Sequence, residues 1–154
     1  MPFFINTPTI RNMKTIIPIE QLSIPPTGIH LLIKVYINRK VARFVIDTGA
    51  SQTVLDLHRI SHFIPKGAKR KLDSTTAGIG TNKIRSAAST IKLLKIGTAV
   101  AQDYEIVLLD LSHVNNSYQL LGFKTVDGIL GSDLLKKFEA VIDFKKLQLT
   151  LQEK

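Results

Sequence analysis

Short apolar runs separated by turn residues dominate this chain. The clearest pair is Ile29–Ile37 and Val41–Ile46, with Asn38-Arg39-Lys40 between them, and this pattern predicts a β-hairpin. A second hairpin is predicted at the end of the chain, from Val141–Phe144 and Leu147–Leu151. We expect further strands at Thr53–Leu57, Ser89–Ile96 and Glu105–Leu109, and Asp127–Leu130 is a short apolar segment.

Helical periodicity is scarce by comparison. His58–Ile64 is predicted to form a helical turn that Pro65 ends. Ser132-Asp133 has the residue types that cap a helix, so we expect a helix at Leu134–Phe138 with Asp133 as its N-cap. The polar stretch Leu111–Gly122 is predicted to be a loop. Many short strands and one short C-terminal helix predict an all-β fold, a small closed barrel.

The length of 154 residues fits one folded domain. Pro25-Pro26-Thr27-Gly28 marks a turn, and we divide the chain there into an N-terminal arm, residues 1–27, and a domain, residues 28–154. The absence of cysteine excludes a thiol nucleophile, a disulfide framework and a cysteine zinc site.

The formal net charge is +9, and its densest cluster is Lys66, Lys69, Arg70 and Lys71. Aromatic residues do not alternate with these basic residues, so we interpret them as a solvated surface and expect no nucleic-acid partner. No apolar stretch is long enough to predict a transmembrane helix, and the first ten residues do not resemble a signal peptide. We therefore expect a cytoplasmic protein with no membrane partner.

Asp47-Thr48-Gly49 is the segment with the clearest chemistry. The apolar strand Arg43–Ile46 leads directly into this acid, and Gly49 permits a tight turn. An acid on a rigid turn with an apolar strand behind it is expected to be poorly solvated, which favours a chemical role. The structural alternative is an Asx-turn, in which Asp47 only bonds its own backbone.

Three segments together carry a resemblance to a known family. They are Phe44–Leu55 (FVIDTGASQTVL), Ala77–Thr81 (AGIGT) and Asp127–Leu135 (DGILGSDLL). In this order they resemble the active-site turn, the flap tip and the apolar-glycine element of retropepsin-like aspartic proteases, most closely the bacterial single-domain members. The resemblance covers about residues 29–151.

This resemblance implies an aspartic endopeptidase on a retropepsin-type barrel. Asp47, Thr48 and Gly49 would form the catalytic turn, while Ala50 and the flap residues would bind the substrate; the flap residues are Ala77, Gly78, Ile79 and Gly80. The reaction needs two carboxylates, and this chain holds one Asp-Thr-Gly, so two identical chains are expected to build one site. The expected partner is a peptide or protein substrate, with no metal and no cofactor.

Two positions depart from the viral members of the family. Ser132 stands where they usually have an arginine, and Ser51 replaces its acidic partner, which leaves the viral style of dimer contact open. Two other functions also stay open at this point. One is a non-catalytic peptide- or protein-binding module on the same fold, and the other is a nucleic-acid-binding barrel, which rests on the net charge alone.

The remaining polar residues near these segments are expected to be structural. Asp143 lies in a late strand, and we interpret it as an outward or turn-facing acid. His58, His62 and His113 stand apart from one another and from any acid cluster in the sequence, so we expect no metal site at them.

Overall fold

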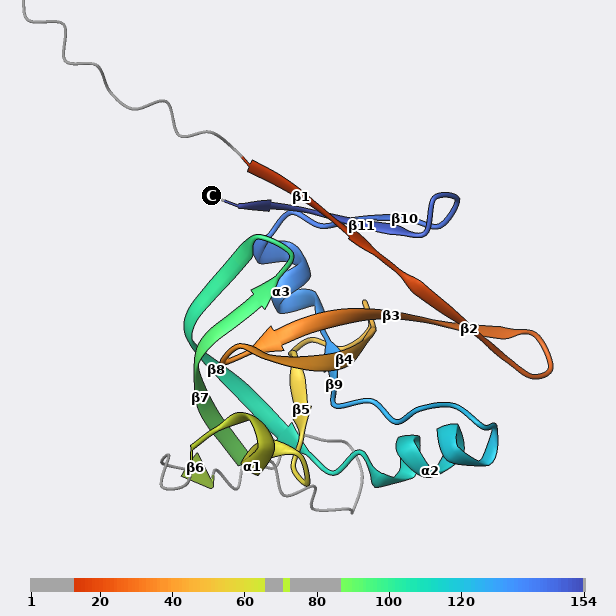
Figure 1. Cartoon of the computed structure of the whole chain (residues 1–154), viewed down its shortest axis with the longest axis horizontal. Helices are drawn as coiled ribbons and strands as arrows, with labels where there is room; N and C mark the ends of the chain where they lie inside the picture. The colour runs from red at the N-terminus through yellow and green to blue at the C-terminus, as the bar shows by residue number, and fades with distance from the viewer. Residues whose placement is uncertain (1–12, 66–70, 73–86, 154) are drawn as a thin grey trace, which may run out of the picture.

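The computed structural model describes residues 13–65, 71–72 and 87–153. Strands and short helices are arranged as Figure 1 shows. The strands are β1 (Met13–Pro18), β2 (Glu20–Ile24), β3 (Gly28–Ile37), β4 (Lys40–Ile46), β5 (Val54–Asp56), β6 (Lys71–Leu72), β7 (Ala87–Ile96), β8 (Ala99–Leu109), β9 (Gly128–Leu130), β10 (Val141–Asp143) and β11 (Gln148–Glu153). The helices are α1 (Ile60–Phe63), α2 (Ser112–Leu120) and α3 (Ser132–Lys137).

The main sheet closes on itself. Its strand order is β2-β3-β4-β9-β5-β8-β7-β6, and β3 pairs with β7 as well as with β4. This second pairing joins Tyr36 and Ile37 to Lys95 and Leu94 and completes a closed barrel of six strands. The predicted all-β barrel is therefore confirmed, and so is the hairpin formed by β3 and β4.

The short strand β9 lies between β4 and β5. It runs parallel to β4 and antiparallel to β5, so a segment from late in the chain is inserted between two early strands. Gly128 permits this insertion, because a Cβ there would lie 2.4 Å from both the Phe44 ring and the Val54 carbonyl oxygen. The barrel interior is filled by fully buried side chains such as Phe44, Leu55, Ile91 and Leu108.

A second sheet of order β1-β11-β10 lies beside the barrel, on the side where α3 is found (Figure 1). β1 pairs along its whole length with β11, and β2 pairs with β3. Most of residues 13–24 therefore form strands of the two sheets. The division of the chain at residue 27 stays a prediction.

The predicted loop at Leu111–Gly122 is wrong. Ser112–Leu120 form the helix α2, which follows β8 and contacts β3 through the Tyr118 hydroxyl and His30 Nδ1. Its Tyr118 is only 2% exposed and packs in a small cluster with Leu32 and Val126. The expected single helix near the C-terminus is present as α3, and the helical turn at α1 is confirmed.

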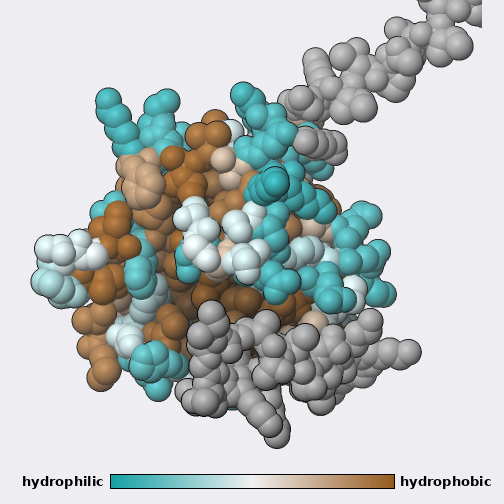
Figure 2. Space-filling view, turned by 180° about the vertical axis from the view of Figure 1, so that it is seen from behind, coloured by the Kyte–Doolittle hydropathy of each residue, from teal (hydrophilic) through white to brown (hydrophobic). Residues whose placement is uncertain are grey.

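Apolar side chains remain at the surface. From the side opposite to Figure 1, they spread over one half of the molecule and continue into a hollow near its centre (Figure 2). Among the described residues, the most exposed are Leu120, Ile16, Phe144 and Val141. No described helix is long and apolar enough to cross a membrane.

Candidate active site

The Asp47 turn begins where β4 leaves its pairing with β9. The Asp47 N–H donates to the Leu130 carbonyl at 3.0 Å, which extends the β4–β9 ladder by one residue. The Ala50 N–H then donates to the Asp47 carbonyl at 3.2 Å, and the chain turns back toward β5. The backbone of this turn is thus fixed where it begins by β9, which belongs to the segment Asp127–Leu135.

The Asp47 side chain forms an Asx-turn. Its Oδ1 accepts the Gly49 N–H at 2.9 Å, as the structural alternative expects. Asp47, Thr48 and Gly49 are exposed in the single chain, and Ala50 is half-buried. The expectation of a poorly solvated acid is therefore wrong for one chain alone, because nothing described in that chain covers the turn.

The backbone of Gly131 packs directly against the turn. A Cβ at this position would lie 2.5 Å from the Gln52 carbonyl carbon and 2.9 Å from the Ala50 carbonyl oxygen. The next residue, Ser132, donates its N–H to that same Ala50 oxygen at 2.8 Å. Glycine is therefore required here, since any side chain would separate the two segments.

Beneath the turn, a partly buried hydrogen-bond network links the residue before β5 to β8 and to α3. Thr53 Oγ1 accepts the Gly131 N–H at 3.0 Å and donates to Asp133 Oδ1 at 2.7 Å. Tyr104, on β8, donates its hydroxyl to the other Asp133 oxygen. Burial alone would raise the pKa of Asp133, but the hydrogen bonds from Tyr104 and Thr53 outweigh it and hold that pKa below its usual value.

Asp133 therefore has a different role from the one predicted. The N-cap of α3 is Gly131, and Asp133 lies inside the first turn of the helix. Its carboxylate points to Thr53 and Tyr104 instead of capping the helix. Burial, and then the hydrogen bond to Asp133, raises the pKa of the Tyr104 hydroxyl well above its usual range.

Two other acids have structural partners. Asp127 accepts the Arg43 N–H at 2.9 Å and pairs with Arg59 Nε at 2.8 Å. Asp143 accepts the Lys146 N–H at 2.8 Å in an exposed turn, which confirms its predicted position. Of the acids in Phe44–Leu55 and Asp127–Leu135, Asp47 is thus the one whose side chain is exposed.

The expectations for the flap residues and for His58 have different outcomes. The flap residues Ala77, Gly78, Ile79 and Gly80 lie outside the described residues. The expectation that His58 stands apart from any acid cluster is wrong, because its Nε2 lies 3.2 Å from Asp110 Oδ1. That pairing was not visible in the sequence, since His58 follows β5 and Asp110 follows β8, far apart along the chain.

A cavity of about 850 Å³ lies away from the Asp47 turn. It is lined by β1, β2 and the outer face of the β3–β4 hairpin, with Phe123 and Lys124 at one side. None of residues 47–50 lines it. A single chain therefore presents the turn on an open surface and not in this cavity.

The comparisons with known proteins agree with this site. A model of the family described as aspartyl protease matches residues 33–134, which is more than half of the chain. The chain belongs to this aspartyl protease family, and its fold is retropepsin-like. A search of curated proteins finds no match.

Solved structures of the same fold come from diverse sources. A retropepsin-like aspartic protease from Rickettsia conorii is 22% identical, with a TM-score of 0.54 over 92% of this chain and 91% of that one. The retroviral protease-like domain of Ddi1 from Leishmania major is 16% identical, with a TM-score of 0.52 over 79% and 87%. The EIAV protease, solved with the inhibitor HBY-793, is 16% identical, with a TM-score of 0.54 over 80% and 100%.

Proposed function

We propose that the protein is an aspartic endopeptidase whose active site is built by two identical chains, each contributing Asp47. The observation that carries the proposal is the placement of Asp47. Its side chain is exposed at the tip of a turn whose backbone is fixed by β9 and by Gly131. A carboxylate held in this way is oriented but still accessible to water and to a peptide.

The chemistry follows from two carboxylates held close together. Two such groups cannot both ionise easily, so they share a proton and titrate as a unit. The ionised carboxylate takes a proton from a bound water, whose oxygen attacks the carbonyl carbon of the peptide bond. The protonated carboxylate donates to the carbonyl oxygen. Proton transfer to the nitrogen then allows the C–N bond to break, which releases a carboxylic acid and an amine.

The second carboxylate is assigned to a second chain because this chain has one Asp-Thr-Gly. Asp127 and Asp133 are engaged by Arg59 and by Thr53 and Tyr104. A two-fold axis beside the turn brings two copies of Asp47 together without any change in the chain. Contact between the two chains at this axis also covers the turns, which are exposed in the single chain.

The neighbouring residues support this arrangement. In the proposed dimer, Thr48 braces the two turns by hydrogen bonding across the axis, and Ala50 lines the substrate cleft. Gly49 keeps the carboxylate uncrowded, since a Cβ there would lie 3.2 Å from Asp47 Oδ1. We propose that Ala77, Gly78, Ile79 and Gly80 close over an extended peptide substrate, which binds as an added strand.

The variant Asp47→Asn tests this function. Asparagine keeps the shape of the side chain and can still accept the Gly49 N–H, but it cannot exchange a proton with water. Cleavage of a mixed peptide library should fall at least about 10²–10⁴-fold, the usual contribution of general acid–base catalysis. The measurement is the rate at which new amino termini appear.

Asp143→Asn is the matched control. It makes the same chemical change in an exposed turn, and it should keep the wild-type rate. Cleavage by Asp47→Asn at the wild-type rate would contradict the proposal. A wild-type protein that binds peptides but cuts none of them would favour the binding-module alternative.

A further inference from the structure

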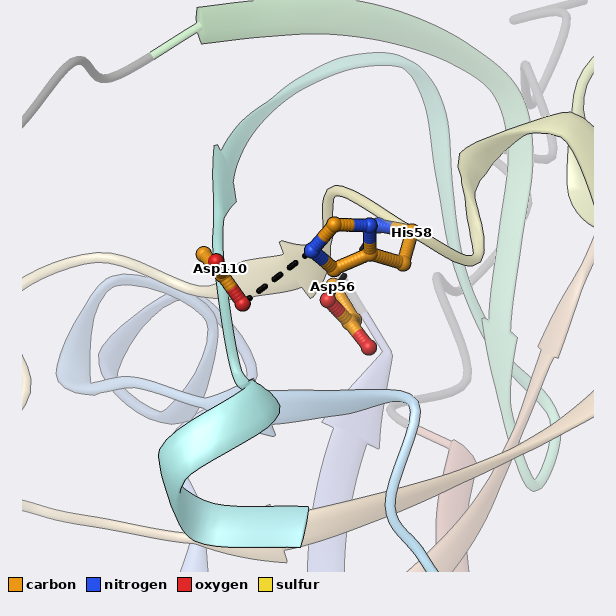
Figure 3. Close-up of side chains that lie close together, drawn as sticks. All are labelled: Asp56, His58 and Asp110. Atoms are coloured by element: carbon orange, nitrogen blue, oxygen red, sulfur yellow. Dashed lines mark hydrogen bonds and ion pairs between the residues drawn. The ribbon is translucent and has the colours of Figure 1, made fainter. Parts of the chain in front are cut away.

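Three side chains with metal-ligand chemistry meet at an edge of the barrel, where β5 and β8 end. Asp56 ends β5, Asp110 directly follows β8, and His58 lies two residues beyond Asp56 (Figure 3). The two strands are parallel, with Asp56 paired to Leu109, so their carboxyl ends meet at the same edge. The Leu57 N–H donates to the Leu109 carbonyl at 2.8 Å and holds the two segments together just beyond the strands.

The candidate ligand atoms are already close. His58 Nε2 lies 3.2 Å from Asp110 Oδ1, and one ligand atom from each of the three residues fits within 4.8 Å of the others. Two ligands bound tetrahedrally to Zn²⁺ at 2.0–2.1 Å lie about 3.3 Å apart. The His58–Asp110 pair has this spacing without any movement. Both side chains are 59% exposed, and Asp110 Oδ1 also accepts the Ser112 N–H at 2.9 Å.

Asp56 supplies an independent observation. This residue is only 4% exposed, which is unusual for an aspartate that has no basic partner among the described residues. Its Oδ1 accepts the N–H groups of His58 and Leu111 at 3.2 and 3.3 Å, whereas its Oδ2 accepts no hydrogen bond from the described residues. Burial of a carboxylate with no cation beside it is costly, and a bound cation would offset that cost.

The local charge also favours a cation. Arg59 follows His58 directly, but its guanidinium forms an ion pair with Asp127, which balances its positive charge. Counted formally, Asp56 and Asp110 bring two negative charges together in a chain whose net charge is +9.

We propose that Asp56, His58 and Asp110 form a Zn²⁺ site that joins the ends of β5 and β8. One imidazole nitrogen and two carboxylate oxygens suit Zn²⁺, and water completes the coordination on the exposed side. The site does not depend on the proposed peptidase function. Its effect is structural, because the metal cross-links two segments of the barrel edge that no covalent bond joins.

Calorimetric titration of the metal-free full chain with Zn²⁺ tests this site. Wild-type protein should bind one Zn²⁺ per chain, and thermal unfolding should shift to higher temperature when Zn²⁺ is added. His58→Ala should weaken binding. Since loss of even an outer partner of a metal ligand costs about 10–100-fold in affinity, loss of the ligand itself should cost at least as much.

His62→Ala is the matched control, because it removes another exposed histidine four residues away, on α1. It should bind Zn²⁺ as the wild type does. Asp110→Asn should behave like His58→Ala, although asparagine keeps the size of the side chain. Absence of Zn²⁺ binding by the wild type overturns the proposal, and so does equal binding by the wild type and His58→Ala.

Discussion

Thr53 holds together the two segments that meet beneath the Asp47 turn. Its hydroxyl is fully buried, accepts the Gly131 N–H and donates to Asp133. Thr53→Val keeps the volume of the side chain but leaves both groups without this partner. The free energy of unfolding should fall by about 1–3 kcal/mol, measured by urea denaturation. The exposed Thr98→Val should change it by no more than about 0.5 kcal/mol, and an equal loss in both variants would contradict the network.

Tyr104 makes the stability of the same network depend on pH. Its hydrogen bond helps to hold the pKa of Asp133 below the unfolded value, so the ionised carboxylate stabilises the fold. This contribution is complete above the unfolded pKa of about 3.9 and is lost as pH falls through the folded pKa. The stability difference between wild type and Tyr104→Phe should therefore be largest near neutral pH and shrink below about pH 4. A difference that is constant from pH 7 to pH 2.5 would exclude this role.

The Asp47 turn could be predicted from the sequence, whereas the residues that support it could not. Asp47, Thr48 and Gly49 are adjacent, and the strand that leads into them is visible as an apolar run. Asp133, in contrast, bonds Thr53 and Tyr104 across 80 and 29 residues of sequence. Ser132-Asp133 has the local pattern of a helix cap, and only the fold shows that the carboxylate points elsewhere.

At the scale of elements, β1 packs against the turn between β7 and β8. Gly97 in that turn has φ +61°, and a Cβ there would lie 2.3 Å from Thr15 Oγ1. Gly122 has a similar φ of +75° but nothing within 4 Å of such a Cβ. Gly122→Ala should therefore cost about 1 kcal/mol for the backbone alone, and Gly97→Ala should cost more because it also displaces β1. The comparison is made by thermal unfolding, with hydrogen exchange in β1; equal costs and unchanged exchange would argue against close packing of β1.

Helix α2 is the element that the sequence pattern did not predict. Asn115 and Asn116 lower its intrinsic helix propensity, and its surface is mostly polar. The helix is stabilised by contacts distant in sequence: Tyr118 is buried against Leu32, and the Asn115 side chain exchanges two hydrogen bonds with the Val126 backbone. By comparison, the β3–β4 hairpin was predictable because its pairing is local.

At the scale of the whole molecule, the barrel presents the Asp47 turn, and no described residue of the chain covers it. Closure of the sheet through β3 and β7, and the insertion of β9 between β4 and β5, fix that turn in space. The sequence predicted a closed barrel, but the insertion of β9 follows from pairings between segments more than 70 residues apart. The proposed function requires that a second copy of the molecule meets the first at this turn.

The most direct measurement of that requirement is peptide cleavage by mixed dimers. Wild-type chains are refolded together with increasing amounts of Asp47→Asn chains, at a constant amount of wild type. If each site needs Asp47 from both chains, a nine-fold excess of the variant leaves only about one wild-type chain in ten with a wild-type partner, and activity per wild-type chain falls to about one tenth. The same excess of Asp143→Asn chains should cause no such fall. Activity that stays constant as Asp47→Asn is added would show that one chain suffices, and it would contradict the two-chain active site.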